Sequence, residues 1–182
     1  MTTSAFTVRV ATPADTPTIH AFVCELAEFE KLRHEVVLTP ERMCADFEAG
    51  RFECLLAEAD GQSVGFALIF HVYSTFEGLS LYLEDLYVSP AARGKGCGKL
   101  LLQSVAATAR DRDCARLQWQ ALDWNEAAVK FYLSEHVGAR LRVGDDGTKW
   151  LNFIMGRDQI AKLASAGGAT SAASATLGTA SE

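Results

Sequence analysis

The stretch Arg93-Gly94-Lys95-Gly96-Cys97-Gly98-Lys99 lies between a predicted strand and a predicted helix. Its three alternating glycines permit positive φ angles and keep side chains away, so main-chain N–H groups can approach an anion closely. The helix that follows directs its unpaired N–H groups and the positive end of its dipole toward the same place. Arg93, Lys95 and Lys99 add three cationic side chains. We therefore expect this segment to bind a phosphate-bearing ligand.

Two common phosphate loops are excluded by residue type. A Walker A loop needs Gly at position 93 and Ser or Thr at position 100, where this chain has Arg93 and Leu100. A dinucleotide fingerprint needs Gly at position 99, which is Lys99. A flexible connector with solvated charges is the remaining alternative, and the position of the segment between a strand and a helix disfavours it.

The pattern outside the loop predicts a mixed sheet with helices. Apolar residues at helical spacing predict helices, and alternating or continuous apolar runs predict strands. The expected helices are 15–29, 39–50, 98–111 and 125–134, and the expected strands are 7–10, 53–59, 63–73, 81–88, 115–120, 139–143 and 149–155. Asp60-Gly61, between the second and third strands, is typical of a tight hairpin turn. This order indicates an α/β (α+β) fold whose sheet is mostly antiparallel.

A single domain over residues 7–164 is expected, after a short extension over residues 1–6. A chain of 182 residues is long enough to bury a sizeable core. Residues 165–182 are almost wholly Ala, Gly, Ser and Thr, and such a segment cannot bury enough apolar area to offset the entropy of ordering. We expect it to be a disordered tail.

Net charge, hydropathy and the spacing of cysteines and histidines together disfavour several classes of partner, location and site. The formal net charge of −6 disfavours nucleic acid, whose phosphates an acidic surface repels. No apolar run long enough to span a membrane and no secretion signal are visible, so the expected location is the cytoplasm. The five cysteines form no C-x-x-C pair and the histidines lack ligand spacing, so neither a disulfide framework nor a metal site is expected.

Three segments together resemble a known family. The Arg-x-x-Gly-x-Gly pattern at 93–98 resembles the acetyl-CoA pyrophosphate motif of the GNAT superfamily of N-acetyltransferases. Leu-Tyr-Leu-Glu-Asp-Leu-Tyr-Val at 81–88 and Trp-Asn-Glu-Ala-Ala-Val-Lys-Phe-Tyr at 124–132 are most similar to the spermidine/spermine (diamine) N-acetyltransferase group. The resemblance covers about residues 6–162. It implies a mostly antiparallel central sheet flanked by about four helices, with an acetyl-CoA cleft between splayed central strands.

The resemblance also implies roles for individual residues. Glu84 matches the general base and Tyr132 the acid that protonates the departing thiolate. Asp85 and Trp150 match residues near the acceptor amine. Separately from the resemblance, the acidic residues that follow one another in the N-terminal part of the chain, Glu25, Glu28, Glu30 and Glu35, are expected to line an amine site, with Glu28 as the candidate contact. The positions expected to bind acetyl-CoA are Leu86, Tyr87, Val88, Arg93, Gly94, Lys95, Gly96, Cys97, Gly98, Lys99 and Asn125. Because adjacent strand residues point to opposite faces, Glu84 and Asp85 are expected on opposite sides of their strand.

The expected reaction is direct attack of a primary amine on acetyl-CoA in a ternary complex. Polyamine-acetylating members carry an acid before the Leu-Glu-Asp strand, and residues 73–78 lack it, with Glu77 as a possible replacement. The loss of this acid disfavours long polyamines and leaves shorter amines open. The expected acceptor is a small cationic amine: a diamine, a polyamine, thialysine or a lysine-like amino acid. The alternatives are a non-catalytic acyl-CoA sensor of the same fold and an acetyltransferase for a protein amine. The resemblance further implies a homodimer.

Overall fold

A computed structural model describes residues 6–143 and 153–165. The chain forms two compact units, Met1–Trp124 and Asn125–Glu182. The first contains the strands β1 (Thr7–Val10), β2 (Glu53–Ala59), β3 (Gln62–Ser74), β4 (Gly78–Val88) and β5 (Arg116–Gln118), and the helices α1 (Thr16–Phe29), α2 (Pro40–Glu48) and α3 (Cys97–Asp111). The second contains α4 (Glu126–Tyr132) and α5 (Arg157–Ser165).

The five strands form one sheet in the order β1-β2-β3-β4-β5. Each neighbouring pair is antiparallel except β4 and β5, which run parallel. The expected hairpin between β2 and β3 is confirmed, because both Asp60 and Gly61 have positive φ angles, 52° and 75°, as a type I′ turn requires. The expected mixed, mostly antiparallel sheet is therefore confirmed.

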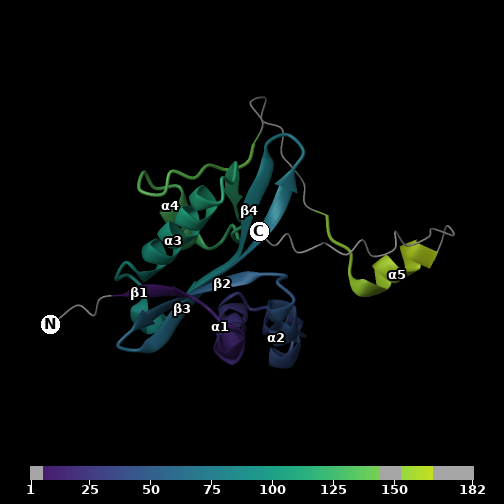
Figure 1. Ribbon diagram of the computed structural model, residues 1–182, viewed down its shortest axis with the longest axis horizontal. Coiled ribbons are helices and arrows are strands. Elements are labelled where there is room, and N and C mark those ends of the chain that lie inside the picture. Colours follow the sequence, from purple (N-terminus) through teal and green to yellow (C-terminus); the bar gives the residue numbers. More distant parts are fainter. Residues whose placement is uncertain (1–5, 144–152, 166–182) are drawn as a thin grey trace, which may run out of the picture. The chain divides into compact units, whose positions relative to one another are not determined.

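Helices cover both faces of this sheet in the first unit. In Figure 1, α1 and α2 lie side by side on one face and α3 lies on the other. The expected start of α2 is confirmed, since Pro40 is its first residue and the Thr39 hydroxyl accepts a hydrogen bond from the N–H of Arg42 (3.3 Å). Such a cap satisfies one of the N–H groups that the first turn leaves unpaired.

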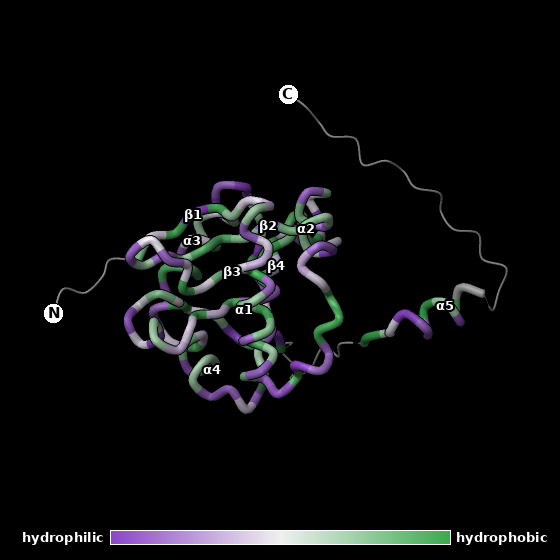
Figure 2. Tube along the Cα trace, turned by 90° about the horizontal axis from the view of Figure 1, so that it is seen from below, coloured by the Kyte–Doolittle hydropathy of each residue, from purple (hydrophilic) through white to green (hydrophobic). Residues whose placement is uncertain are grey.

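The core lies between the sheet and these helices. On the α1 side, Phe22 of α1 stacks on Phe66 of β3, with ring centroids 6.1 Å apart, and contacts Tyr87 of β4. On the α3 side, Leu101 and Val105 are fully buried. Figure 2 shows hydrophobic stretches along the central strands and mainly hydrophilic turns at the rim. Burial of these apolar side chains is the principal contribution to stability.

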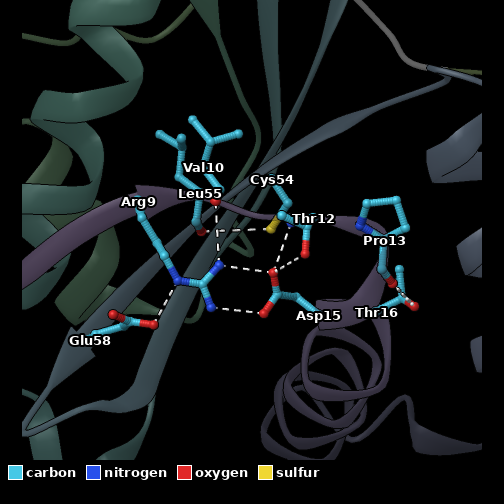
Figure 3. A network of polar contacts seen from close by, with 9 residues as sticks. All are labelled: Arg9, Val10, Thr12, Pro13, Asp15, Thr16, Cys54, Leu55 and Glu58. Atoms are coloured by element: carbon cyan, nitrogen blue, oxygen red, sulfur yellow. Dashed lines mark hydrogen bonds and ion pairs between the residues drawn. The ribbon is translucent and has the colours of Figure 1, made fainter.

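A charged network joins β1, the start of α1 and β2 (Figure 3). The guanidinium of Arg9 donates two hydrogen bonds to the carboxylate of Asp15, each 2.8 Å long, and a third to Glu58 (2.7 Å). Asp15 also accepts from the N–H and the hydroxyl of Thr12. The pKa of Asp15 is held well below its usual range, chiefly by these hydrogen bonds from Arg9. The network fixes the edge strand to the first helix.

The second unit differs from the sequence-based expectation. The predicted strand over 139–143 is wrong: only Val143 forms an isolated bridge, and Leu141 is 68% exposed. An alternating pattern of apolar residues is compatible with a strand, but a strand also needs a neighbouring strand with which to pair. Of the predicted strand over 149–155, residues 149–152 lie outside the described residues, and 153–155 are not in a strand. Helix α5 was not predicted, although Ala, Leu, Lys and Gln favour a helix there.

Candidate functional site

The predicted phosphate loop joins β4 to α3. After Val88 a short 3₁₀ turn, η3 (Pro90–Ala92), leads to Gly94 and Gly96, whose φ angles are 72° and 93°. Gly96 directly precedes α3, and nothing lies within 4 Å of the place where a Cβ would stand on either glycine. The first N–H groups of this 15-residue helix have no partner within the helix. The loop therefore offers open space and main-chain donors to an anion.

The side chains of the loop are held in different ways. Lys95 donates through Nζ to the carbonyl of Ala91 (2.9 Å), and Lys99 is exposed. Cys97 is buried, and burial raises the pKa of its thiol. A thiol that keeps its proton is a poor nucleophile. These surroundings suit Cys97 to packing rather than to nucleophilic chemistry.

The side chain of Arg93 folds back onto the end of β4. Its Nε donates to the carbonyl of Val88 (2.8 Å), and its guanidinium carbon lies 5.2 Å from the ring centroid of Phe29 and 5.5 Å from that of Tyr87. The hydroxyl of Tyr87 donates to Glu25 (2.6 Å). Burial and this carboxylate raise the pKa of Tyr87 to about 12, so the phenol keeps its proton at neutral pH.

The edge of β4 that faces β5 is paired only in part. Pairing with β5 runs from Ser80 to Tyr82, whereas β4 continues to Val88. Among the described residues, no strand pairs with this edge of Glu84–Val88. Strand residues alternate the direction of their backbone N–H groups. Part of the N–H groups near Leu86, Tyr87 and Val88 therefore faces an open edge, as expected for splayed strands.

A β-bulge at Glu84 changes which residues share a face. Asp85 pairs with Leu68 and Leu83 with Ile69, so Glu84 is the extra residue on β4. Tyr82 pairs with Phe70 and Asp85 with Leu68, and these two β3 residues both face the α1 side of the sheet. Burial, followed by the charge of Glu84, raises the pKa values of both Tyr82 and Asp85. Because the bulge breaks the alternation, Tyr82 and Asp85 share a face although they are three residues apart. The expectation that Glu84 and Asp85 lie on opposite sides stays a prediction.

Two further carboxylates, Glu84 and Glu30, act electrostatically on Asp85. Asp85 is half-buried, and burial, followed by the charges of Glu84 and Glu30, raises its pKa to about 7. Glu30 follows the last residue of α1, and burial raises its pKa as well. Glu84 itself is exposed. Such a group favours a bound cation or a proton, because like charges that are shielded from water repel each other.

The other predicted residues are placed as follows. Glu28 is exposed on α1, one residue before Phe29, and Trp150 lies outside the described residues. Asn125 caps α4, its side-chain oxygen accepting from the N–H of Ala128 (3.3 Å). Tyr132 ends α4 and is half-buried, and burial raises its pKa. The roles assigned to these four residues stay predictions.

Comparison with known families decides the class of the protein. The family model of the acetyltransferase (GNAT) family matches residues 20–138, which include the loop, the bulge and α4. The chain belongs to the GNAT family. It is therefore an N-acetyltransferase, and the GNAT fold implies acetyl-CoA as its co-substrate.

Curated relatives of this GNAT protein include amine acetyltransferases. Thialysine N-epsilon-acetyltransferase of Mus musculus is 38% identical over 167 residues, covering 86% of this chain and 96% of the relative. The enzyme of the same name from Caenorhabditis elegans is 35% identical over 127 residues, covering 70% and 79%. Spermidine/spermine N(1)-acetyltransferase-like protein 1 of Homo sapiens is 30% identical over 168 residues, covering 87% of this chain and 24% of that protein.

Solved structures support the same fold. An integron cassette protein from V. cholerae superposes with a TM-score of 0.66 at 24% identity, covering 88% of this chain and 98% of that one. An aminoglycoside acetyltransferase from an uncultured soil metagenomic sample gives a TM-score of 0.68 at 16% identity, covering 82% and 97%. At these identities the likeness concerns the fold alone.

Within the described residues, no helix is both long and apolar enough to cross a membrane. The same residues contain no group of three or more His, Cys, Asp or Glu side chains arranged to hold a metal ion.

Proposed function

We propose that this GNAT protein transfers the acetyl group of acetyl-CoA to the terminal primary amine of a small lysine-like molecule such as thialysine. The observation that carries the proposal is the group formed by Glu30, Glu84 and Asp85, beside the open edge of β4. The names of the relatives that are 35–38% identical to this chain support the choice of acceptor. Transfer to a protein amine and a purely binding role are the less favoured alternatives.

The residues of the loop fit the diphosphate of coenzyme A. Gly94 and Gly96 leave room for phosphate oxygens, and the N-terminal turn of α3 supplies N–H donors and a favourable dipole. The proposed cofactor-binding set is therefore 86–88 on β4, the loop 93–99 and Asn125. Bound acetyl-CoA supplies an activated thioester. Free N–H groups on the open edge of β4 are suited to hold the pantetheine arm in the manner of an added strand.

The carboxylates are proposed to receive the acceptor amine. An alkylamine is an ammonium ion at neutral pH and must lose a proton before it can attack. Glu84 is exposed and can take this proton directly or through a water molecule. Asp85 and Glu30 stabilise the positive charge of the arriving ammonium, because its binding relieves their mutual repulsion. Tyr132 is the proposed acid, and burial, which raises its pKa, leaves the phenol protonated at neutral pH.

The tip of the β3–β4 hairpin favours short acceptors. Glu77 forms an ion pair with Arg116 (2.6 Å), so its charge is already compensated. Glu77 and Glu84 are seven positions apart in the chain, which corresponds to about 23 Å along an extended strand. Within one chain Glu77 is therefore poorly suited to bind the distal amine of a polyamine whose first amine is at Glu84. This supports lysine-like acceptors over long polyamines.

A turnover assay tests this proposal. The full chain is incubated with acetyl-CoA and each of thialysine, lysine, ornithine and spermidine, and release of free thiol is followed. We expect kcat/KM to be highest for thialysine or lysine and at least tenfold lower for spermidine. Tyr132→Phe and Glu84→Gln are each expected to lower kcat by about a hundredfold, the usual contribution of a general acid or base. Tight binding of acetyl-CoA without turnover of any amine would favour the binding role.

We also propose that the enzyme is a metal-free homodimer in the cytoplasm. The resemblance to the diamine acetyltransferases supports the dimer. The exposed aromatic side chains of Tyr73 and Phe76 at the hairpin offer apolar area to a second chain. Light scattering after gel filtration gives the mass, and a monomer at micromolar concentration would contradict the dimer.

A further inference from the structure

Arg93 joins the two halves of the proposed site. It stands directly before Gly94 of the phosphate loop, while Phe29, against which its guanidinium packs, stands directly before Glu30. The third partner is the end of β4, through the ring of Tyr87 and the carbonyl of Val88. We call this cluster of Phe29, Tyr87, Val88 and Arg93 the Arg93 latch.

The two aromatic rings of the latch are themselves packed against other side chains. The ring of Tyr87 is buried against Phe22 and Phe66, at centroid distances of 5.8 and 6.4 Å, and its hydroxyl is tied to Glu25. The ring of Phe29 also contacts that of Trp124, with the two centroids 5.6 Å apart. A guanidinium is planar and weakly hydrated, so it can lie against aromatic rings while its N–H groups donate in a fixed direction. A lysine ammonium offers no such plane.

We propose that Arg93 is a positioning residue that couples cofactor binding in the loop to the placement of Glu30 in the acceptor site. This inference rests on the function proposed above. When a diphosphate fixes the position of Gly94 and its neighbours, the contact between Arg93 and Phe29 also fixes the position of the C-terminal end of α1, which Glu30 follows. The coupling is reciprocal, because an amine that orders the end of α1 must favour the cofactor by the same factor.

Binding measurements can test the coupling without turnover. Coenzyme A is titrated calorimetrically into the full chain, alone and with a saturating amount of thialysine or of the amine that is turned over fastest. For the wild type we expect the amine to tighten the affinity for coenzyme A at least fivefold, the lower end of common coupling. In Phe29→Leu and Arg93→Lys this factor is expected to fall below about twofold.

A matched control separates the latch from a general loss of an aromatic ring. Phe47→Leu removes one ring of a different pair, Phe47 and Phe52 (5.2 Å), and is expected to keep the wild-type factor. Phe29 is 40% exposed, so its replacement by Leu leaves the fold intact, which thermal unfolding checks. KM values for acetyl-CoA and for the amine are expected to rise together in Phe29→Leu, by about three- to tenfold.

The outcomes separate this inference from the proposed function. If the wild type binds no coenzyme A, the proposed function fails and the coupling fails with it. If coenzyme A binds, and the amine tightens its affinity for Phe29→Leu by the same factor as for the wild type, the latch is overturned while the proposed function stands. A wild-type factor retained by Arg93→Lys would likewise overturn it, because a point charge on the phosphate would then suffice.

Discussion

Asp85 is the residue whose surroundings depart most from those of an ordinary strand carboxylate. Its pKa is raised to about 7 by burial and then by the charges of Glu84 and Glu30. The pKa of the Cys54 thiol is raised chiefly by burial, with the charge of Asp85 as a smaller cause. In the unfolded chain Asp85 ionises at its ordinary value near 4. The contribution of Asp85 to the free energy of unfolding is therefore fully present below about pH 4, and it is lost as the pH rises toward 7. A site that holds repelling carboxylates is stabilised when a cation binds.

Replacing Asp85 by Asn is expected to stabilise the free protein in a pH-dependent way. At pH 8 the free energy of unfolding rises by about 1–2 kcal/mol, a value reduced from the full shift because water reaches the site. At pH 4 the gain is close to zero, since the wild-type carboxyl is then largely protonated. Urea unfolding at both pH values measures this. An equal gain in stability at both pH values would contradict the raised pKa. In the same variant, we expect kcat/KM for the amine to fall at least tenfold.

At the scale of elements, the junction between β4 and α3 decides what the protein can bind. The strand leaves its neighbour β5 after Tyr82, and the loop then turns through Gly94 and Gly96 into the helix. A positive φ costs an L-residue roughly 1–2 kcal/mol. The glycines therefore allow the shape of the loop, and the open space beside them is where we propose that the diphosphate binds.

Gly94→Ala and Gly50→Ala form a matched pair that separates these two effects. Gly50 follows α2, has a φ of 67° against 72° for Gly94, and likewise has no atom within 4 Å of the place where a Cβ would stand. Both substitutions are expected to lower the free energy of unfolding by about 1–2 kcal/mol. Only Gly94→Ala should raise KM for acetyl-CoA, by at least tenfold. Equal KM values for the two variants would argue against phosphate binding in the loop.

A second pair tests the close approach of β3 and β4. A Cβ on Gly65 would stand 2.6 Å from the carbonyl oxygen of Tyr87, whereas one on Gly98 would meet only the Val88 side chain, at 3.7 Å. Gly65→Ala is expected to cost about 2–3 kcal/mol, because the backbone of β4 must move. Gly98→Ala should leave stability unchanged or raise it by up to about 1 kcal/mol through helix propensity. Thermal unfolding of the two variants compares them directly.

For the first unit as a whole, charged contacts near β1 add to the apolar core. The carboxylate of Asp15 accepts from both Arg9 and Thr12, and this lowers its pKa. The unfolded chain therefore binds a proton at a higher pH than the folded one. The contribution of Asp15 to stability is complete above about pH 4 and is lost as the pH falls toward the folded-state pKa.

Asp15→Asn should make the protein less stable at neutral pH and less sensitive to acid. At pH 7 we expect a loss of about 1–2 kcal/mol, since hydrogen bonds to charged groups are lost from a partly exposed site. The difference between variant and wild type should shrink as the pH falls below about 3. Urea unfolding at pH 7 and pH 3 provides the measurement, and a constant difference would contradict the assigned network.

Some features of this protein follow from short stretches of sequence. The Asp60-Gly61 turn, the Thr39-Pro40 helix start and the glycine loop were predictable, because their chemistry involves residues only a few positions apart. The strand predicted over 139–143 was wrong and α5 was missed, since spacing alone does not supply a partner strand. The bulge at Glu84 depends on its register with β3, which no local pattern reports.

The sequence alone therefore determined the family and the conformation of the glycine loop, and it supplied the positions proposed for phosphate binding, for the acid and for the base. Only the tertiary structure decided that the charges of Glu84 and Glu30 act on a half-buried Asp85, and that Arg93 packs on Phe29, which is far away in the chain. The physical reason is that a loop's backbone conformation is set by neighbouring residues. The pKa of a carboxylate and the packing of a guanidinium are set instead by groups that folding brings together.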